Sequence, residues 1–162
     1  MTHSSEHRLH ELLEGFDTAM LVTHGANGSI NARPMGVAEM SKSGELYFVT
    51  SAPSAKVREI QNDSDVTLIF QSNKTFVSLN GTAVVVKDAA LVGRLWSEAW
   101  KLWFPEGKTD PSIRLLRISP VDAEYWDNSG MQGSSYAFEA AKAYIKGMTP
   151  DVPDKQHGKI LL

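Results

Sequence analysis

Short apolar segments separated by tight turns are the feature that most constrains how this 162-residue chain can fold. The segments are rich in β-branched, aromatic and leucine residues, and Gly, Pro, Asn or Ser bounds them, as is typical of strands. Most are joined by turns too short for a crossover helix, so neighbouring strands are expected to be antiparallel. The pattern predicts a mainly β (α+β) chain with an antiparallel barrel and flanking helices. The expected strands cover 19–23, 30–40, 45–50, 66–70, 75–79, 82–86, 113–118 and 123–126.

Helical spacing or capping signals mark four other stretches. In the N-terminal helix, expected over 1–16, Ser4 or Ser5 is the expected N-cap, Gly15 the expected end, and the apolar face consists of Leu9, Leu12, Leu13 and Phe16. Further helices are expected over 53–62, from Asp88 to about Leu102, and over 136–145, with an irregular tail at 149–158. No linker or repeat interrupts the sequence. We therefore expect one domain over 1–162, with the barrel at 17–127 and a C-terminal helix and tail at 134–162.

Composition excludes several classes of function. The formal net charge of −3 gives no general attraction to nucleic acid or to an anionic membrane, so we expect neither as a partner. The chain has no cysteine, which excludes disulfides, thiolate metal sites and cysteine nucleophiles. His3, His7 and His10 share a helix face, but a solvated helix surface explains them without a metal, and no metal site is expected. No apolar run reaches the roughly 20 residues of a membrane span, and the charged N-terminus does not resemble a signal peptide, so a cytoplasmic location is expected.

The segment 49–58 carries the strongest local signal for a ligand. A strand here runs directly into a helix whose N-cap is expected near Ser51 or Ala52, with Pro53 in the first turn. Free N–H groups and a partial positive charge make a helix N-terminus attractive to an anion. The expected phosphate cradle adds hydroxyls and a cation: Thr50, Ser51, Ser54 and Lys56. A capped surface helix with solvated Lys56, Arg58, Glu59 and Gln61 would give the same pattern.

Arg33 lies in the middle of a mainly apolar strand, where a buried guanidinium needs a partner. A ligand phosphate would serve, and so would an ordinary salt bridge to Glu39 or Asp17. Pro34 cannot donate to a ladder and therefore predicts an edge, a bulge or a functional interruption, and the backbone around Met35 and Gly36 would let a flat ligand lie close.

Trp96, Trp100 and Trp103 are spaced i, i+4, i+7 and are expected on one face of the helix ending near Leu102. Such a face is more often core or dimer contact than cofactor wall. No nucleophile–base pair can be recognised, so an enzyme with this sequence would depend on a cofactor for its reactivity.

The ordered motifs from about residue 10 to residue 127 resemble those of the pyridoxamine 5′-phosphate oxidase-like FMN-binding split barrels, in the branch similar to general stress protein 26. No piece is specific alone, but the ordered set is. It consists of 21–23, 32–35, 46–50, 54–57, 77–83, 95–96, 103–107, 110–111, 115–118 and 123–127.

This resemblance implies a six-stranded antiparallel split β-barrel that forms a homodimer, with FMN, or FAD as the alternative, at the subunit interface. It implies that Arg33 and the backbone of Pro34, Met35 and Gly36 contact the flavin, and that Thr50, Ser51, Ser54 and Lys56 hold the ribityl phosphate. Trp126 would approach from the partner subunit. The implied function is a stress-related flavin-dependent oxidoreductase that exchanges electrons with an unknown small molecule. The alternative is a non-catalytic flavin-binding or sensing module. Haem or a deazaflavin is a third choice, for which His24 and His157 offer no convincing context.

Two departures from the family pattern argue against vitamin B6 oxidation, and a third concerns the phosphate. Ala38 stands where pyridoxamine phosphate oxidases carry a lysine, and the stretch 128–133 lacks their arginine and histidine. Ala55 stands where many carry an arginine, so the phosphate would depend on Lys56.

Overall fold

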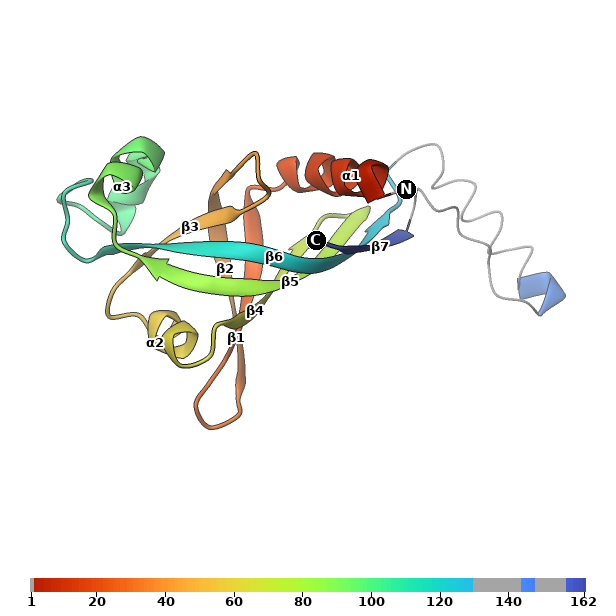
Figure 1. The fold of residues 1–162 in the computed structure, drawn as a ribbon, viewed down its shortest axis with the longest axis horizontal. Helices are drawn as coiled ribbons and strands as arrows, with labels where there is room; N and C mark the ends of the chain where they lie inside the picture. The colour runs from red at the N-terminus through yellow and green to blue at the C-terminus, as the bar shows by residue number, and fades with distance from the viewer. Residues whose placement is uncertain (1, 130–143, 148–156) are drawn as a thin grey trace.

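The computed structural model describes residues 2–129, 144–147 and 157–162 (Figure 1). An antiparallel sheet with the strand order β3-β2-β1-β4-β5-β6-β7 forms most of this part of the chain. The strands are β1 (Thr18–His24), β2 (Ile30–Met40), β3 (Leu46–Ser51), β4 (Asp65–Gln71), β5 (Thr75–Val86), β6 (Ile113–Asp127) and β7 (His157–Leu161).

The long strand β6 closes the sheet into a barrel. One of its edges pairs with β5, and the other is shared between two strands. Ile113–Ile118 pair with β3, which closes β1–β6 into a ring, and Asp122–Trp126 pair with β7. The predicted mainly β, six-stranded antiparallel barrel with flanking helices is therefore confirmed. β7 extends the sheet beyond the barrel and lies where an irregular tail was expected.

Two pairs of predicted strands are each one continuous strand. The predicted turn at Asn80-Gly81 is wrong, because β5 passes through it with a bulge: Asn80 pairs with Asp122, and Gly81 pairs with Pro120. A Cβ on Gly81 would lie 2.6 Å from the carbonyl oxygen of Ser119. The glycine thus allows the two backbones to approach each other. In the sequence alone, the same glycine is a turn signal. The break expected between 118 and 123 is likewise absent from β6.

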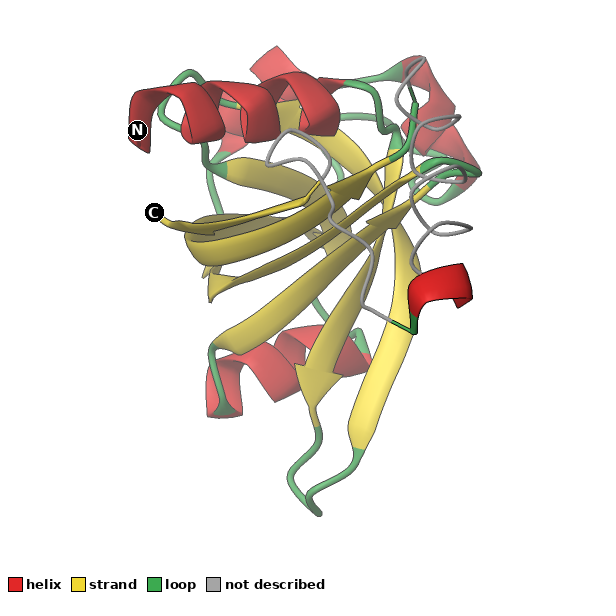
Figure 2. Ribbon diagram, turned by 90° about the vertical axis from the view of Figure 1, so that its right-hand side faces the viewer, coloured by secondary structure: helices red, strands yellow, loops and turns green. Residues whose placement is uncertain are grey.

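The main core fills the barrel with inward-facing side chains that alternate along each strand, as in β3, where Leu46 and Phe48 are buried. The helix α1 (Thr2–Glu14) covers one side with its predicted leucine face. The predicted end at Gly15 is confirmed, but Ser4 and Ser5 lie inside the helix and so cannot cap it. Figure 2 shows α1 and the helix α2 (Ala55–Asn62) on opposite sides of the sheet.

A second, smaller core lies beside the barrel, where the expected continuous helix from Asp88 to about Leu102 is in fact two pieces. The side chain of Asp88 caps α3 (Ala89–Leu95), accepting a hydrogen bond from the Leu91 N–H at 3.0 Å. At Trp96 the backbone turns to φ −51° and ψ 131°, and a 3-10 helix, η1 (Glu98–Leu102), follows.

This break changes the environment of the three tryptophans. Trp100 is buried in the second core with Val92 and Leu115, and Trp96 packs edge-on against it at 5.6 Å between ring centroids. Trp103 is 64% exposed. The predicted single tryptophan face is therefore wrong, because helical spacing does not continue through a break in the helix.

Most of the helix expected over 136–145 lies outside the described residues, although 144–146 are helical. In the described ranges no helix has the length and apolar character needed to cross a bilayer. Within the same ranges, no cluster of three or more His, Asp or Glu side chains could hold a metal ion.

Candidate functional site

A cavity of about 550 Å³ opens between β2, the end of β3, α2 and the η1 segment. It brings together the two segments that the sequence singles out, although these are well separated along the chain. The predicted site residues that line it are Pro34, Met35, Gly36, Thr50, Ser51 and Lys56.

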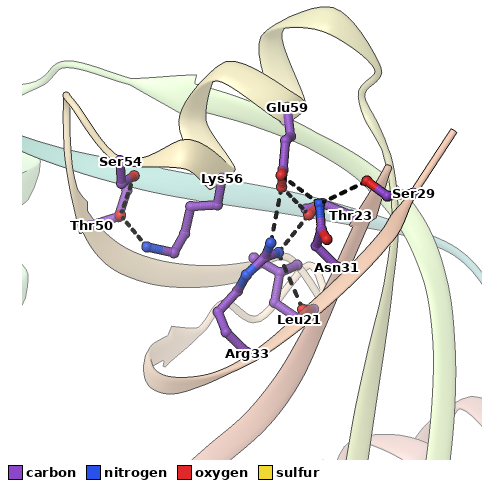
Figure 3. Close-up of polar contacts among 9 residues, drawn as sticks. All are labelled: Leu21, Thr23, Ser29, Asn31, Arg33, Thr50, Ser54, Lys56 and Glu59. Atoms are coloured by element: carbon purple, nitrogen blue, oxygen red, sulfur yellow. Dashed lines mark hydrogen bonds and ion pairs between the residues drawn. The ribbon is translucent and has the colours of Figure 1, made fainter. Parts of the chain in front are cut away.

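The end of β3 and the start of α2 supply the polar side of this cavity. The N-cap of α2 is Ser54, in an extended conformation (φ −69°, ψ 149°), and its side chain makes no capping hydrogen bond. The predicted N-cap near Ser51 or Ala52 is therefore wrong, and Pro53 precedes the helix. The hydroxyl of Ser54 lies 3.2 Å from that of Thr50, and the ammonium of Lys56 donates to Thr50 Oγ1 at 3.3 Å. We call Thr50, Ser54 and Lys56 the polar corner (Figure 3).

Lys56 is the cation of the polar corner. It is half-buried, and no carboxylate of the described chain forms an ion pair with it. Burial lowers the pKa of its ammonium below the usual value, and the positive charge of Arg33 lowers that pKa further, while Glu59 opposes both. A cation that is partly desolvated and lacks a counter-ion attracts an anionic ligand group.

Arg33 has its partners inside the protein. Its guanidinium forms an ion pair with Glu59 at 2.9 Å and donates to Thr23 Oγ1 at 2.5 Å (Figure 3). The salt bridge considered from sequence thus exists, but its partner is on α2. Neither Glu39 nor Asp17 is that partner, and Glu39 pairs with Arg94 instead. Arg33 does not line the cavity, so its assignment as a flavin contact remains a prediction.

Glu59 is not among the site residues predicted from the sequence, but its carboxylate lies at the centre of this network. It accepts hydrogen bonds from Thr23 at 2.5 Å and from Asn31 at 2.7 Å, besides its ion pair with Arg33. The hydrogen bond from Thr23 holds the pKa of Glu59 low, and the contacts of Asn31 and Arg33 add to this against the effect of burial. The alternative of a helix with solvated charges holds for Arg58, which is exposed, but not for Lys56 and Glu59, which are both half-buried.

The backbone of β2 forms a second side of the cavity. Pro34 pairs with Met20 of β1, whereas β3 pairs with β2 only from Val37 onward. Pro34 therefore lies where one edge of β2 is open, as its missing N–H predicts. Met35 points inward and is 9% exposed, while Gly36 next to it is exposed.

Aromatic side chains of η1 and of the two residues that follow it form the third side: Trp100, Trp103 and Phe104. Their role as cavity wall could not be inferred from spacing, because the helix break that orients them has no strong sequence signal. Trp126, by contrast, lies at the other end of β6, pairs with Phe76 and stacks on His157 at 5.4 Å between ring centroids. It does not line this cavity.

Comparison with known proteins adds a family to this geometry. Residues 4–151 match the model of the family described as pyridoxamine 5′-phosphate oxidase like. General stress protein 26 of Bacillus subtilis is 30% identical over 82 residues, which cover 48% of this chain and 58% of that protein. The chain spans less than two thirds of the length of the curated relatives that it matches.

Two solved structures show the same fold. A candidate general stress protein 26 from Jannaschia sp. CCS1 superposes with a TM-score of 0.74 at 22% identity, covering 99% of both chains. The general stress FMN/FAD binding protein of Xanthomonas citri has a TM-score of 0.65 at 30% identity, covering 76% of this chain and 88% of its own. From the family match and these likenesses together, we conclude that the chain belongs to the pyridoxamine 5′-phosphate oxidase-like family, in its general stress protein 26-like branch.

Proposed function

We propose that this protein binds a flavin nucleotide, FMN in the first place and FAD as the alternative, in the cavity between β2, β3, α2 and η1. The observation that carries the proposal is the polar corner beside an apolar wall: an ammonium with no carboxylate partner among the described residues and two hydroxyls on one side, aromatic rings on the other. A flavin nucleotide has matching parts, an anionic phosphate and a flat apolar ring system. The Xanthomonas citri relative, which is described as binding FMN and FAD, supports the same ligand class.

Bound flavin would supply the redox chemistry, and the residues of this chain would bind and orient it. Lys56 and the hydroxyls of Thr50 and Ser54 would hold the phosphate, with Ser51 beside them. The backbone at Pro34, Met35 and Gly36 would lie against the ring. On this basis we propose a flavin-dependent oxidoreductase with a small-molecule electron donor or acceptor. The alanine at position 38 packs among apolar side chains of the second core, which supports a substrate other than a pyridoxal phosphate.

A non-catalytic flavin-binding or sensing protein is the second candidate, and one observation favours it. Lys56, assigned here to the phosphate, is the one ionisable side chain among the described residues that line the cavity, so that no further acid or base lines it to serve a second substrate. Anaerobic stopped-flow reduction with NADH and NADPH separates the two candidates. Rapid, saturable bleaching of bound flavin supports the oxidoreductase, and flavin that stays oxidised supports the sensor.

We further propose that the protein is a homodimer in which the partner's barrel covers the flavin. Apolar side chains on the outside of the barrel support this: Met20, Ile69 and Val84 are 38–47% exposed. Sedimentation equilibrium with and without FMN measures the oligomeric state, and a monomer under both conditions would contradict a shared site.

Flavin binding itself is tested by titrating the purified protein, stripped of ligand, with FMN, FAD and riboflavin while following the quenching of flavin fluorescence. The proposal predicts saturable binding of FMN that is tighter than binding of riboflavin. Absence of binding for all three at micromolar concentration would refute it.

A further inference from the structure

Glu59 lies close to the proposed phosphate site and yet carries a negative charge. Its carboxylate is fully engaged: one oxygen accepts from Thr23 and Arg33, and the other accepts from Asn31. Both partners of the ion pair are mostly shielded from water, with side-chain exposures of 15% for Glu59 and 21% for Arg33. The carboxylate is therefore held in one place rather than free to turn toward solvent.

This carboxylate and the ammonium of Lys56 are three residues apart on α2, so that they lie on adjacent turns of one helix face. The guanidinium of Arg33 lies within electrostatic reach of both. The charges of Arg33 and Glu59 both act on Lys56 of the polar corner, and their ion pair largely cancels them. Lys56 remains as the charge that an anion at the corner would meet.

We propose that Glu59 is a specificity-determining residue, which cancels the charge of Arg33 near the polar corner and thereby sets how strongly the site prefers a phosphorylated flavin to an unphosphorylated one. The inference rests on the proposed flavin function. With Glu59 present, Arg33 is neutralised and contributes little to phosphate affinity. Without the negative charge, Arg33 and Lys56 would act on the phosphate together.

The charge of Glu59 balances the guanidinium of Arg33, and it also acts on any anion held at the polar corner. A glutamine at position 59 has the same shape, and its amide oxygen can accept hydrogen bonds from Thr23 and Arg33. A carboxylate at this place weakens the binding of every anion by repulsion. The charge of Glu59 should therefore affect ligand choice, whereas its shape and hydrogen bonds serve the fold.

The test measures the ratio of FMN affinity to riboflavin affinity by fluorescence quenching. Glu59→Gln should raise this ratio about tenfold, the effect of one unit charge acting over roughly 10 Å at an effective dielectric of about 20. The dependence of FMN affinity on salt should become steeper. Arg33→Gln should lower the ratio by a similar factor, and the double variant should return it near the wild-type value because the net charge is restored.

Glu6→Gln is the matched control. It removes the same charge from α1, where Glu6 lines a different pocket, and should leave the ratio unchanged. An unchanged ratio in Glu59→Gln, or equal losses for FMN and riboflavin, would overturn the proposal. If that variant does not fold, Arg33→Gln decides alone, because a ratio that does not fall contradicts the charge balance.

The side-chain NMR signal of Lys56 in ligand-free protein, titrated with inorganic phosphate, provides a readout independent of flavin. Tighter phosphate binding in Glu59→Gln than in the wild type supports the charge role even if no flavin binds, in which case only the proposed function fails. Equal phosphate affinity in both proteins, together with an unchanged flavin ratio, refutes the inference while leaving flavin binding intact.

Discussion

The replacement Lys56→Met tests the central residue of the proposed site. It removes the ammonium but keeps most of the apolar stem, so that packing against the end of β3 is retained. In the structure the ammonium has the Thr50 hydroxyl as its hydrogen-bond acceptor and no ion-pair partner among the described residues. Nothing in the ligand-free protein is therefore left unpaired by the change, apart from one hydroxyl that can bond to Ser54.

The size of the effect follows from the interaction that is lost. A charge-assisted hydrogen bond to a phosphate contributes about 1.5–3 kcal/mol. FMN affinity should fall by about 10- to 150-fold. Riboflavin has no phosphate, so its affinity should change by less than about threefold. Equal losses for the two ligands would refute the assignment of Lys56 to the phosphate.

Fluorescence quenching by both ligands measures these affinities, and Lys42→Met is the control. Lys42 is an exposed lysine that lines a different pocket, so its loss changes the net charge equally without touching the polar corner. The stability of the ligand-free protein gives a second readout, in which no loss is expected although FMN affinity falls. Burial and the charge of Arg33 disfavour the ammonium of Lys56, so Lys56→Met should not lower the melting temperature of ligand-free protein.

The direction of this pKa shift also fixes a pH dependence. Lys56 has a lowered pKa in the folded protein, so the folded state releases its proton before the unfolded state does. The preference for FMN over riboflavin should therefore fall as pH rises, at a lower pH than the ordinary lysine value of 10.5. Over the same window the ligand-free protein should gain stability, because the unfolded state binds more protons. Both trends should be absent in Lys56→Met.

Four further predictions concern other parts of the molecule. The ion pair of Arg8 with the 5%-exposed Asp127 holds α1 to β6, so Arg8→Ala should lower the free energy of unfolding in urea by about 1–3 kcal/mol. Burial alone would raise the pKa of Asp127, but the hydrogen bonds from Ser129 and Arg8 lower it. The stability that the Asp127 carboxylate contributes should therefore be lost as pH falls through this lowered pKa. An unfolding free energy that does not fall on acidification would contradict this prediction. Gly81→Ala should cost about 1–3 kcal/mol in the same assay because of the close backbone at Ser119, and a neutral result would show that the strands can separate. Trp126→Ala should weaken flavin binding while leaving the circular dichroism spectrum of the barrel intact.

The barrel could be predicted from the sequence because the signals that specify its strands and turns are local. Alternating apolar residues specify strands, and Gly28 and Gly44, both with positive φ, specify hairpin turns between them. The errors occurred where a local signal has two meanings. Asn80-Gly81 is a strong turn signal, but the same small residue also permits a bulge against β6, and only the tertiary pairing decides between them.

The candidate site was predicted in part for the same reason. The strand-to-helix junction and the proline-bearing strand could each be recognised, and the structure places most of their singled-out residues around one cavity. The aromatic wall could not be recognised from the sequence, since it depends on the helix break at Trp96. Glu59 was missed because helical periodicity places a residue on a face without saying what covers that face. Here the β1–β2 strands cover it with Thr23, Asn31 and Arg33.

The proposed dimer can be tested at Trp126, which lies far from the polar corner of its own chain. Arg114 pairs with Thr50 of the polar corner, and Trp126 lies twelve residues further along the same strand, which at about 3.3 Å per residue is roughly 40 Å of extended chain. Its own indole cannot therefore contact a ligand held at its own polar corner. If Trp126→Ala loses flavin affinity, the lost contact is one made by Trp126 of a second copy of the chain. The loss of affinity should then be seen only at concentrations where the wild type is dimeric. A variant with full affinity would leave Trp126 as a partner of His157 on the sheet edge, with the flavin held by β2, β3, α2 and η1 alone.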